Sequence, residues 1–309
     1  MNYIILDMEW DNAYCPKFKG FINQILQIGA VKIDADMRIT DTFDVTVKSS
    51  FTKKVSRRCS ELTGITTEEM LAGVPLEVAI GRYNEWAGND TVTLTWSDSD
   101  LYTVLQNEKL LPDGVRMHIE KYMDLQKYIQ NEMRLCGYEV NGQISLANAA
   151  EILGVTAEGL ELHNAKDDSI LSAALLKKYF CPERMKQYIK DTENPEFYAR
   201  LRFKPYYIKD ISNRLIDGEQ LKFLCDSCGG EAKRKSRWRF NNRWFKAEFC
   251  CPECKRRFIG RVCFRKTFDD LIVKKAITEI KRKQDTAVDT SDTAQKDVNN
   301  EMQSLSTTV

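Results

Sequence analysis

The sequence predicts an α/β domain over residues 1–182, followed by a small β-rich module that binds a metal ion through cysteines. Strand and helix patterns alternate along the first part of the chain. Six of the ten cysteines lie between Cys225 and Cys263. The net charge of +1 also hides an uneven distribution, because residues 231–266 contain 13 Lys and Arg against 3 Asp and Glu. The two parts therefore differ in composition and in expected function.

The composition is that of a water-soluble globular protein, with 43% hydrophobic and 29% charged residues among 309. No apolar run approaches the roughly 18 residues that cross a bilayer. The short apolar stretch at the N-terminus runs directly into Asp7 and Glu9, unlike a secretion signal. We therefore expect a cytoplasmic protein with no membrane segment, whose cysteines serve metal binding more readily than disulfides.

Hydrophobic periodicity places the elements of the first domain. Alternating and β-branched residues predict strands, and apolar residues three and four positions apart, with capping residues at the ends, predict helices. The expected strands are Tyr3–Leu6, Gln24–Asp34, Thr42–Val47 and Thr91–Trp96. The expected helices are short pieces between Thr66 and Ile80, one that follows the Ser97–Asp100 turn through Leu105, one from Ser145 to Gly154, and one from about Asp167 through Tyr179.

The rest of the chain is divided by composition. We expect a helix and linker at 183–218, a basic zinc ribbon at 219–268 and a short amphipathic helix at 269–283. Residues 284–309 contain no aromatic residue and much Ser, Thr, Asp and Gln, so a disordered tail is expected there.

Five polar residues in three separate segments are candidates for a catalytic site. Asp7 and Glu9 lie two positions apart at the end of the first strand, on one face of it. Asp100 lies in a strand-to-helix turn, and His163 precedes Asp168 by five positions at a helix start. Taken singly, each has a simpler interpretation as a solvated strand end, a helix cap or a surface histidine.

Together these residue types suit the hydrolysis of a phosphodiester. That reaction needs charge compensation on the attacking and leaving oxygens, which two divalent cations roughly 3.5–4 Å apart supply. Carboxylate oxygens prefer Mg²⁺ or Mn²⁺ to zinc. An imidazole can take the proton from the attacking water near neutral pH.

In this order along the chain, the motifs resemble the DEDDh 3′–5′ exonucleases. This DnaQ-like family contains polymerase proofreading subunits, ribonuclease T and the KapD-like sporulation exonucleases. The resemblance covers about residues 1–180, with Ser97 in place of a common glycine and Gln24 in place of a common acidic residue. The matching segments are Asp7 with Glu9; Trp96, Asp100 and Leu105 of a W-G/S-x-x-D pattern; His163, Ala165 and Asp168 of H-x-A-x-x-D; ILQIGAV at 25–31; CSELTGI at 59–65; and SLANAAEILGV at 145–155.

The resemblance implies an RNase H-like mixed sheet of about five strands flanked by helices. It implies that two Mg²⁺ or Mn²⁺ ions are held by Asp7, Glu9, Asp100 and Asp168, with Asp7 between both ions, and that His163 is the general base. Asp98 and Asp167 are neighbours that could take the places of Asp100 and Asp168. The implied reaction releases nucleoside 5′-monophosphates from the 3′ end of a single strand of RNA or DNA.

Two C-x-x-C pairs define the second module. Cys225 with Cys228, and Cys251 with Cys254, are separated by 22 residues and together complete a tetrahedral zinc site. Such a four-thiolate site is closed and therefore structural. Without a metal, so small a module would have little core to stabilise it. Cys250 or Cys263 could replace one of the four ligands.

Alternating cations and aromatic residues in the ribbon suggest contact with nucleic acid, since cations neutralise phosphates and aromatic rings stack on bases. The alternative is that the aromatics form the ribbon core and the charges its solvated face. Two other functions also remain open, a catalytically weak nucleic-acid-binding adaptor and a protein-interaction scaffold with unknown protein partners. The candidate contacts are Arg234, Lys235, Arg237, Trp238, Arg239, Arg243, Trp244, Arg256 and Arg257.

Overall fold

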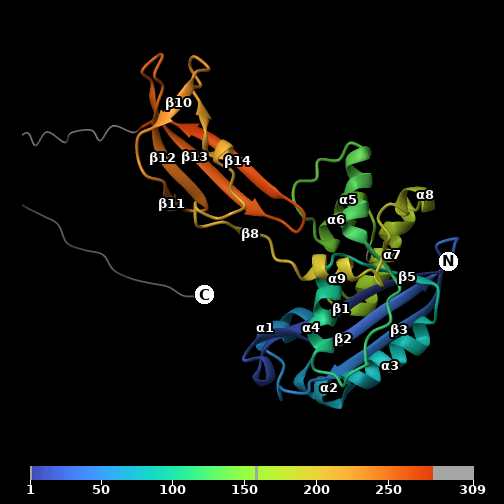
Figure 1. Ribbon diagram of the computed structural model, residues 1–309. Helices are drawn as coiled ribbons and strands as arrows, with labels where there is room; N and C mark the ends of the chain where they lie inside the picture. The colour runs from blue at the N-terminus through green and yellow to red at the C-terminus, as the bar shows by residue number, and fades with distance from the viewer. Residues whose placement is uncertain (1, 157–158, 281–309) are drawn as a thin grey trace, which may run out of the picture. The chain divides into compact units, whose positions relative to one another are not determined.

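The computed structural model describes residues 2–156 and 159–280, and the chain divides into two units after Phe203 (Figure 1). The first unit contains a seven-stranded mixed sheet in the order β4-β3-β2-β1-β5-β6-β7. Its central strands β1, β2 and β3 are antiparallel, whereas β5 and β6 run parallel to β1. The strands are β1 (Asn2–Cys15), β2 (Gly20–Ile33), β3 (Ile39–Lys48), β4 (Val74–Pro75), β5 (Thr91–Thr95), β6 (Lys121–Asp124) and β7 (Lys190–Asp191).

This strand order confirms the expected RNase H-like fold class. Five of the strands have four residues or more, and the two edge strands β4 and β7 have only two each. The main difference from the sequence prediction is the length of β1 and β2. They form a hairpin that continues past the catalytic candidates to Cys15 and Gly20.

Helices cover both faces of the sheet because alternate residues of β1 are apolar on each side. Tyr3 and Ile5 pack with residues of α5 (Leu125–Leu135), α6 (Leu146–Leu153) and α7 (Ala165–Tyr179). Ile4 and Leu6 pack with α3 (Leu76–Ala87) and α4 (Ser99–Glu108) on the other face. A strand buried on both faces is expected at the centre of such a sheet.

Capping residues explain where several helices begin. Ser145 accepts a hydrogen bond from the N–H of Asn148 and starts α6, and Gly154 ends it in the left-handed conformation. Thr66 and Glu69 form a capping box at the start of α2. The remaining short helices are α1 (Arg57–Thr63), α2 (Thr67–Ala72), α8 (Pro182–Met185) and α9 (Pro195–Arg202), with a 3₁₀ turn η1 at Pro16–Phe18.

The second unit is a β-ribbon built on aromatic packing. Its sheet has the order β14-β13-β12-β10-β9, with β11 paired to β12 and β8 paired to β13. Phe245, Phe249, Phe258 and Phe264 form its buried core. The elements are β8 (Tyr206–Tyr207), η2 (Gly218–Leu221), β9 (Phe223–Leu224), β10 (Glu231–Arg234), β11 (Arg239–Asn241), β12 (Trp244–Cys250), β13 (Arg257–Lys266) and β14 (Leu271–Thr278).

Two expectations about this unit are wrong. In the described part of the helix predicted at 269–283, Leu271–Thr278 form strand β14 instead, which pairs antiparallel with β13 from Lys266 to Ile259. Its residues Leu271, Val273 and Ile277 pack on the ribbon core. Residues 204–218 are not a free linker, because Ile208 is buried in the same core and β8 pairs with β13. The tail expected at 284–309 lies outside the described residues.

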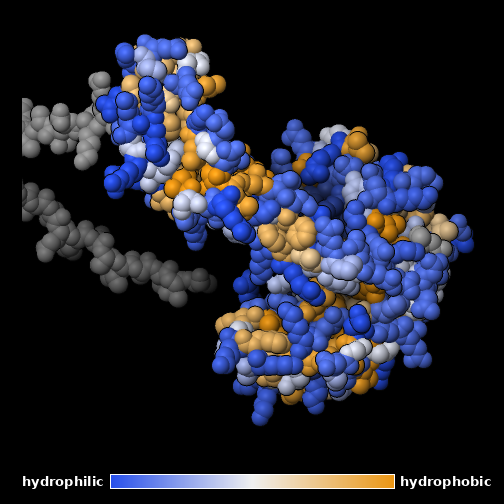
Figure 2. Space-filling view, in the orientation of Figure 1, coloured by the Kyte–Doolittle hydropathy of each residue, from blue (hydrophilic) through white to orange (hydrophobic). Residues whose placement is uncertain are grey.

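Hydrophilic residues occupy most of the visible surface of each unit, with hydrophobic residues in smaller groups (Figure 2). Among the residues that the structure describes, no helix combines the length and apolarity required of a transmembrane segment.

Candidate active site and cysteine cluster

Strand β1 supplies Asp7 and Glu9 from the middle of the sheet. Side chains alternate along a strand, so both carboxylates lie on one face, and Glu9 is only 9% exposed. The ladder between β1 and β2 shifts register between Glu9 and Trp10, because β2 has an extra residue there. Such bulges are common next to active sites, where they redirect the strand.

The turn between β5 and α4 brings Asp100 to the same place. Asp100 is 3% exposed, and its Oδ1 accepts a hydrogen bond from the backbone N–H of Met8 at 3.1 Å. Met8 lies between Asp7 and Glu9, so this bond fixes Asp100 beside both. The neighbouring Asp98 is exposed and lies 3.8 Å from the Nζ of Lys127. The tertiary structure therefore brings Asp100 rather than Asp98 to the other carboxylates.

The start of α7 supplies His163 and Asp168. The N–H of His163 donates to Asp168 Oδ2 at 3.2 Å, and His163 has a left-handed backbone with φ of 65°. One ligand atom each from Glu9, His163 and Asp168 lie within 4.8 Å of one another. Asp167 instead accepts a hydrogen bond from the N–H of Glu161 at 2.9 Å.

A glycine in β2 allows α7 to approach this closely. A Cβ on Gly29 would lie 2.1 Å from the backbone nitrogen of Lys166, so no other residue fits there without a shift. Gln27 accepts a hydrogen bond from the N–H of Ala165, and Ser169 donates to the carbonyl of Gly29 at 3.1 Å. Sequence reasoning did not identify these positioning residues, although a glycine inside a strand signals close backbone approach.

Burial and the charges of nearby carboxylates raise the pKa values of Asp7, Glu9 and Asp100, and burial raises that of Asp168. Burial is the largest cause for each. Burial and the charges of Asp168 and Asp100 raise the pKa of Glu9 to about 8. The pKa of Asp100 is raised to about 7, even though the N–H groups of Asp100 and Met8 lower it. The pKa of Asp7 is also well above its ordinary value, because burial acts together with the charges of Asp100, Glu9 and Asp168.

The pKa of Asp168 is raised mainly by burial, while the N–H of His163 opposes the shift. Four buried carboxylates close together are electrostatically unfavourable in their charged form. A bound cation compensates their charge. The donor set, all oxygens apart from the imidazole of His163, fits hard divalent cations.

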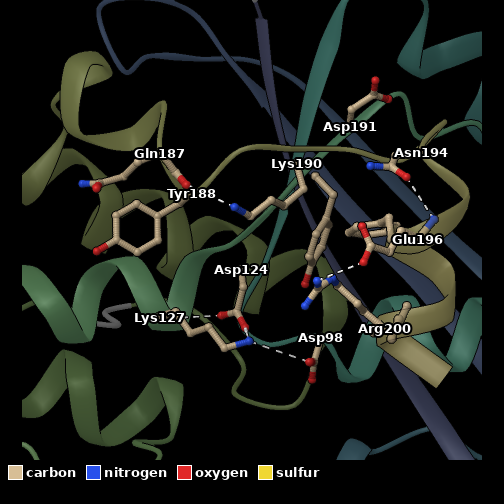
Figure 3. Close-up of a pocket in the computed structure, with 13 residues that line it drawn as sticks. Asp98, Asp124, Lys127, Gln187, Tyr188, Lys190, Asp191, Asn194, Glu196 and Arg200 are labelled. Carbon is tan, nitrogen blue, oxygen red and sulfur yellow. Dashed lines mark hydrogen bonds and ion pairs between the residues drawn. The ribbon is translucent and has the colours of Figure 1, made fainter. Parts of the chain in front are cut away.

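A cavity of about 710 Å³ lies within the same unit, at the ends of β5 and β6 (Figure 3). Its lining includes Asp98, Asp124 and Lys127, and the Nζ of Lys127 lies 2.6 Å from Asp124 Oδ2. Figure 3 shows Lys127 reaching toward both carboxylates. This cavity was not expected from the sequence, since β6 and α5 were not predicted.

In the second unit the two C-x-x-C pairs come together. One sulfur from each of Cys225, Cys228, Cys251 and Cys254 lies within 4.8 Å of the others, with 3.5 Å between the sulfurs of Cys225 and Cys254. Four thiolates around one zinc ion at about 2.3 Å require sulfur separations close to this. Backbone N–H groups lower the pKa of Cys251 to about 7, the largest contribution coming from Cys254.

The two pairs have matching turns. Gly229, with φ of 77°, follows the first pair, and Lys255, with φ of 60°, follows the second. The N–H of Gly229 donates to the carbonyl of Cys225, as the N–H of Lys255 does to Cys251. Cys251 rather than Cys250 therefore belongs to the cluster. The sulfur of Cys250 lies near the backbone carbonyls of Cys251 and Lys255 instead.

The nine candidate nucleic-acid contacts do not form one surface. Trp238 packs between Phe223 and Phe249 in the ribbon core. Arg256 forms an ion pair with Asp226 and Arg257 with Glu248. Arg239 and Trp244 lie on the face of the sheet opposite its core, and Arg243 is exposed in the turn between β11 and β12. Arg234, Lys235 and Arg237 are exposed on and after β10.

Comparisons with known proteins identify the family of the first unit. The family model described as "Exonuclease" (RNase T) matches residues 18–176. The probable 3′–5′ exonuclease KapD of Bacillus subtilis (strain 168) is 26% identical over 204 residues, which cover 64% of this chain and 92% of KapD.

Two solved structures show weaker likeness. The nuclease domain of 3′hExo, a DEDDh family member bound to rAMP, is 22% identical with a TM-score of 0.47, over 60% of this chain and 92% of that one. Escherichia coli exonuclease I in complex with a 5cy-dT13 oligonucleotide is 14% identical with a TM-score of 0.45, over 80% of this chain. This chain spans 54% of exonuclease I, and both TM-scores are below 0.5.

A mixed sheet on which four acidic side chains and a histidine converge defines a nuclease of the carboxylate type. The chain belongs to the exonuclease family, and it is a DEDDh 3′–5′ exonuclease, a hydrolase of phosphodiester bonds.

Proposed function

We propose that this enzyme removes nucleotides from the 3′ end of single-stranded nucleic acid and releases nucleoside 5′-monophosphates. The observation that carries the proposal is the convergence of Asp7, Glu9, Asp100 and Asp168 from three separate elements. The name of KapD, a probable 3′–5′ exonuclease, supports the direction of cleavage.

Two divalent cations, Mg²⁺ or Mn²⁺, would be held by Asp7, Glu9, Asp100 and Asp168. When bound, such ions compensate the charge on the attacking and leaving oxygens. The protein contributes a fixed donor set, because Asp100 is tied to the N–H of Met8 and Asp168 to the N–H of His163. Preorganised carboxylates of this kind need no rearrangement during the reaction.

We assign His163 as the general base. Its ring can lie within 4.8 Å of the carboxylate oxygens of Glu9 and Asp168, and its side chain is exposed to the water that it would deprotonate. The left-handed backbone of His163 turns the chain sharply just before α7 begins. Strained backbone of this kind persists where the surrounding structure holds it, and it is concentrated at active sites.

The four-cysteine cluster would hold one structural zinc ion. All four positions are thiols, so no site is left for water, which is the arrangement of structural rather than catalytic zinc. The ion would join the turn after β9 to the turn after β12 and so stabilise the ribbon.

The ribbon would assist nucleic-acid binding through the exposed face of its sheet. In β12, Phe245 and Phe249 point into the core, so Trp244 and Lys246 point away from it. Residues directly opposite one another on paired strands lie on the same face of the sheet. The residues of β11, β13 and β14 on the same face as Trp244 and Lys246 include further cations. This basic face consists of Arg239, Trp244, Lys246, Arg261, Arg265 and Lys274.

The cations of the basic face are available to an external anion. Within the described part of the chain, none of the five forms an ion pair with a carboxylate. The guanidinium of Arg261 instead lies 4.6 Å from the ring centroid of Trp244, and its Nε is buried without a hydrogen-bond partner in the structure described. Unpaired cations beside a partly exposed aromatic ring suit a phosphate backbone with unstacked bases.

Cleavage by an Asp7→Asn variant tests the catalytic proposal. We expect a 5′-labelled single strand with Mg²⁺ or Mn²⁺ to give a ladder of shortened products with the wild type and no products with the variant. Zinc content and the fold should be unchanged. Full activity of the variant would end the assignment, and a wild type that binds strands without shortening them would support the adaptor alternative. Matched RNA and DNA oligomers would establish the preferred sugar.

A further inference from the structure

A basic segment, Lys53–Arg58 (KKVSRR), is fixed beside the catalytic end of β1. The N–H of Ser56 donates to Asp11 Oδ2 at 2.7 Å, and the hydroxyl of Ser56 donates to Asp11 Oδ1 at 2.8 Å. Asp11 follows Glu9 by two positions, and the extra residue at the bulge belongs to β2, so Asp7, Glu9 and Asp11 share one face of β1. The Cα atoms of Glu9 and Asp11 are therefore only about 7 Å apart.

The segment is anchored on both sides of its lysines. Before them, the hydroxyl of Thr52 donates to Gln24 Oε1 at 3.0 Å. After them, Val55 is buried in a cluster with Leu26 and Met70. The backbone of this loop is consequently held against β1 and β2, while Lys53 and Lys54 remain exposed.

Three of the four cations in the segment have no carboxylate partner among the described residues. These are Lys53, Lys54 and Arg58, and all three are exposed. Arg57 differs, because its Nε lies 2.6 Å from Glu61 Oε1. The segment contains no acidic residue, although the chain outside residues 231–266 has an excess of acidic residues. The accumulation of unpaired positive charge here is therefore local.

We propose that Lys53, Lys54 and Arg58 bind phosphates of the substrate strand on the 5′ side of the scissile bond. This inference rests on the proposed function. A strand cleaved at its 3′ end continues from the catalytic carboxylates only in the 5′ direction, so cations beside those carboxylates meet that part of the strand. Each neutralised phosphate releases counterions, which gives the contact its affinity and its salt dependence.

Salt-dependent kinetics on the full-length protein test the proposal. The variant replaces Lys53, Lys54 and Arg58 by Gln, and Arg57→Gln is the matched control because that arginine is already paired with Glu61. Each protein is assayed on a 20-nucleotide single strand and on a dinucleotide whose only phosphate is the scissile one.

For the triple variant we expect the KM for the long strand to rise roughly ten-fold at low salt. The slope of log affinity against log salt should become shallower by about 2, since each phosphate contact on a single strand contributes about 0.7. The kcat/KM for the dinucleotide and the melting temperature should match the wild type, and Arg57→Gln should behave as the wild type throughout.

An unchanged KM and salt slope would overturn the inference, and an equal loss on the dinucleotide would also overturn it by showing an effect on the catalytic centre itself. Binding of the long strand without added Mg²⁺ or Mn²⁺, followed by fluorescence anisotropy, separates this inference from the proposed function. A wild type that cleaves nothing refutes the exonuclease proposal, yet the difference in salt slope between the triple variant and wild type still decides whether the segment binds phosphates.

Discussion

At the scale of single residues, the site depends on a few side chains whose surroundings distinguish them from their neighbours. Asp98 and Asp100 are both near a strand end, but only Asp100 is buried and bonded to β1. Asp167 and Asp168 are adjacent in α7, yet only Asp168 accepts from the N–H of His163. Motif spacing favoured Asp100 and Asp168, and the structure shows the hydrogen bonds that separate them from their alternatives.

The role of His163 can be separated from metal binding by His163→Ala. As a general base, His163 contributes about 10² to 10⁴-fold to the rate, so kcat should fall by that amount. Binding of Mg²⁺ or Mn²⁺, measured by calorimetry on both proteins, should be unchanged. Loss of metal affinity in the variant would instead identify His163 as a ligand.

Asp7→Asn should stabilise the metal-free protein. The pKa of Asp7 is raised in the folded state, so the folded protein retains a proton that the unfolded chain releases. Stability contributed by such a group is complete below its unfolded pKa and falls as the pH rises toward the folded value. At pH 8 without added Mg²⁺ or Mn²⁺ the melting temperature of the variant should therefore exceed that of the wild type.

Addition of Mg²⁺ should then reverse the order, because only the wild type retains all four carboxylates. Aspartate and asparagine have nearly the same shape, so the comparison isolates charge. A variant that melts below the wild type without added divalent cation would show that burial and the neighbouring carboxylates do not raise the pKa of Asp7 in the folded protein.

At the scale of elements, the sequence predicted the strands and helices that carry regular patterns. Gln24–Asp34, Thr91–Trp96 and Ser145–Gly154 appear close to their predicted places as β2, β5 and α6. The strand at 271–278 was taken for a helix, since a short run of apolar and basic residues fits either period and only pairing with β13 selects the strand. Strand β6, next to the edge strand β7, was missed because four residues give too short a pattern.

The contact between β2 and α7 predicts a large effect for Gly29→Ala. The added Cβ meets backbone atoms of Ala165 and Lys166, which cannot rotate away. We expect the free energy of unfolding to fall by about 3 kcal/mol and activity to fall as His163 and Asp168 are displaced. Urea denaturation measures the first effect and cleavage rate the second.

Gly81→Ala is the control for that substitution. Gly81 lies in the middle of α3, and a Cβ there would have nothing within 4 Å. Alanine is the better helix former, so this variant should be more stable by roughly 0.5–1 kcal/mol. Equal effects of the two substitutions would refute the close-packing explanation.

At the scale of the whole molecule, the two units differ in what stabilises them. The first has two extensive apolar clusters on the faces of its sheet, whereas the second has a small aromatic core and four clustered thiols. We expect chelation of zinc, or Cys251→Ser, to unfold the ribbon, because binding of the ion supplies much of its folding free energy. Circular dichroism and zinc quantification measure this.

The nuclease unit should survive the same treatment. Cleavage of a dinucleotide should be unchanged after Cys251→Ser, and Cys250→Ser should retain zinc and the ribbon fold. Replacing the basic face of the ribbon by Gln should reduce the salt dependence of long-strand binding. A protein that loses dinucleotide cleavage together with zinc would contradict this division.

The sequence by itself determined the chemistry: the five catalytic candidates, the four clustered cysteines, and the alternation of apolar residues that requires helices on both faces of a sheet. These follow from local order and spacing, which the printed chain contains. The tertiary structure decided which of the alternative residues come into contact. It tied Asp100 to Met8, allowed α7 to dock on Gly29, turned the end of the ribbon into a strand and fixed Lys53–Arg58 beside Glu9. The physical reason is that these contacts join residues of different elements, most of them far apart in the chain, and hydrogen bonding and close packing between them arise only when the chain folds.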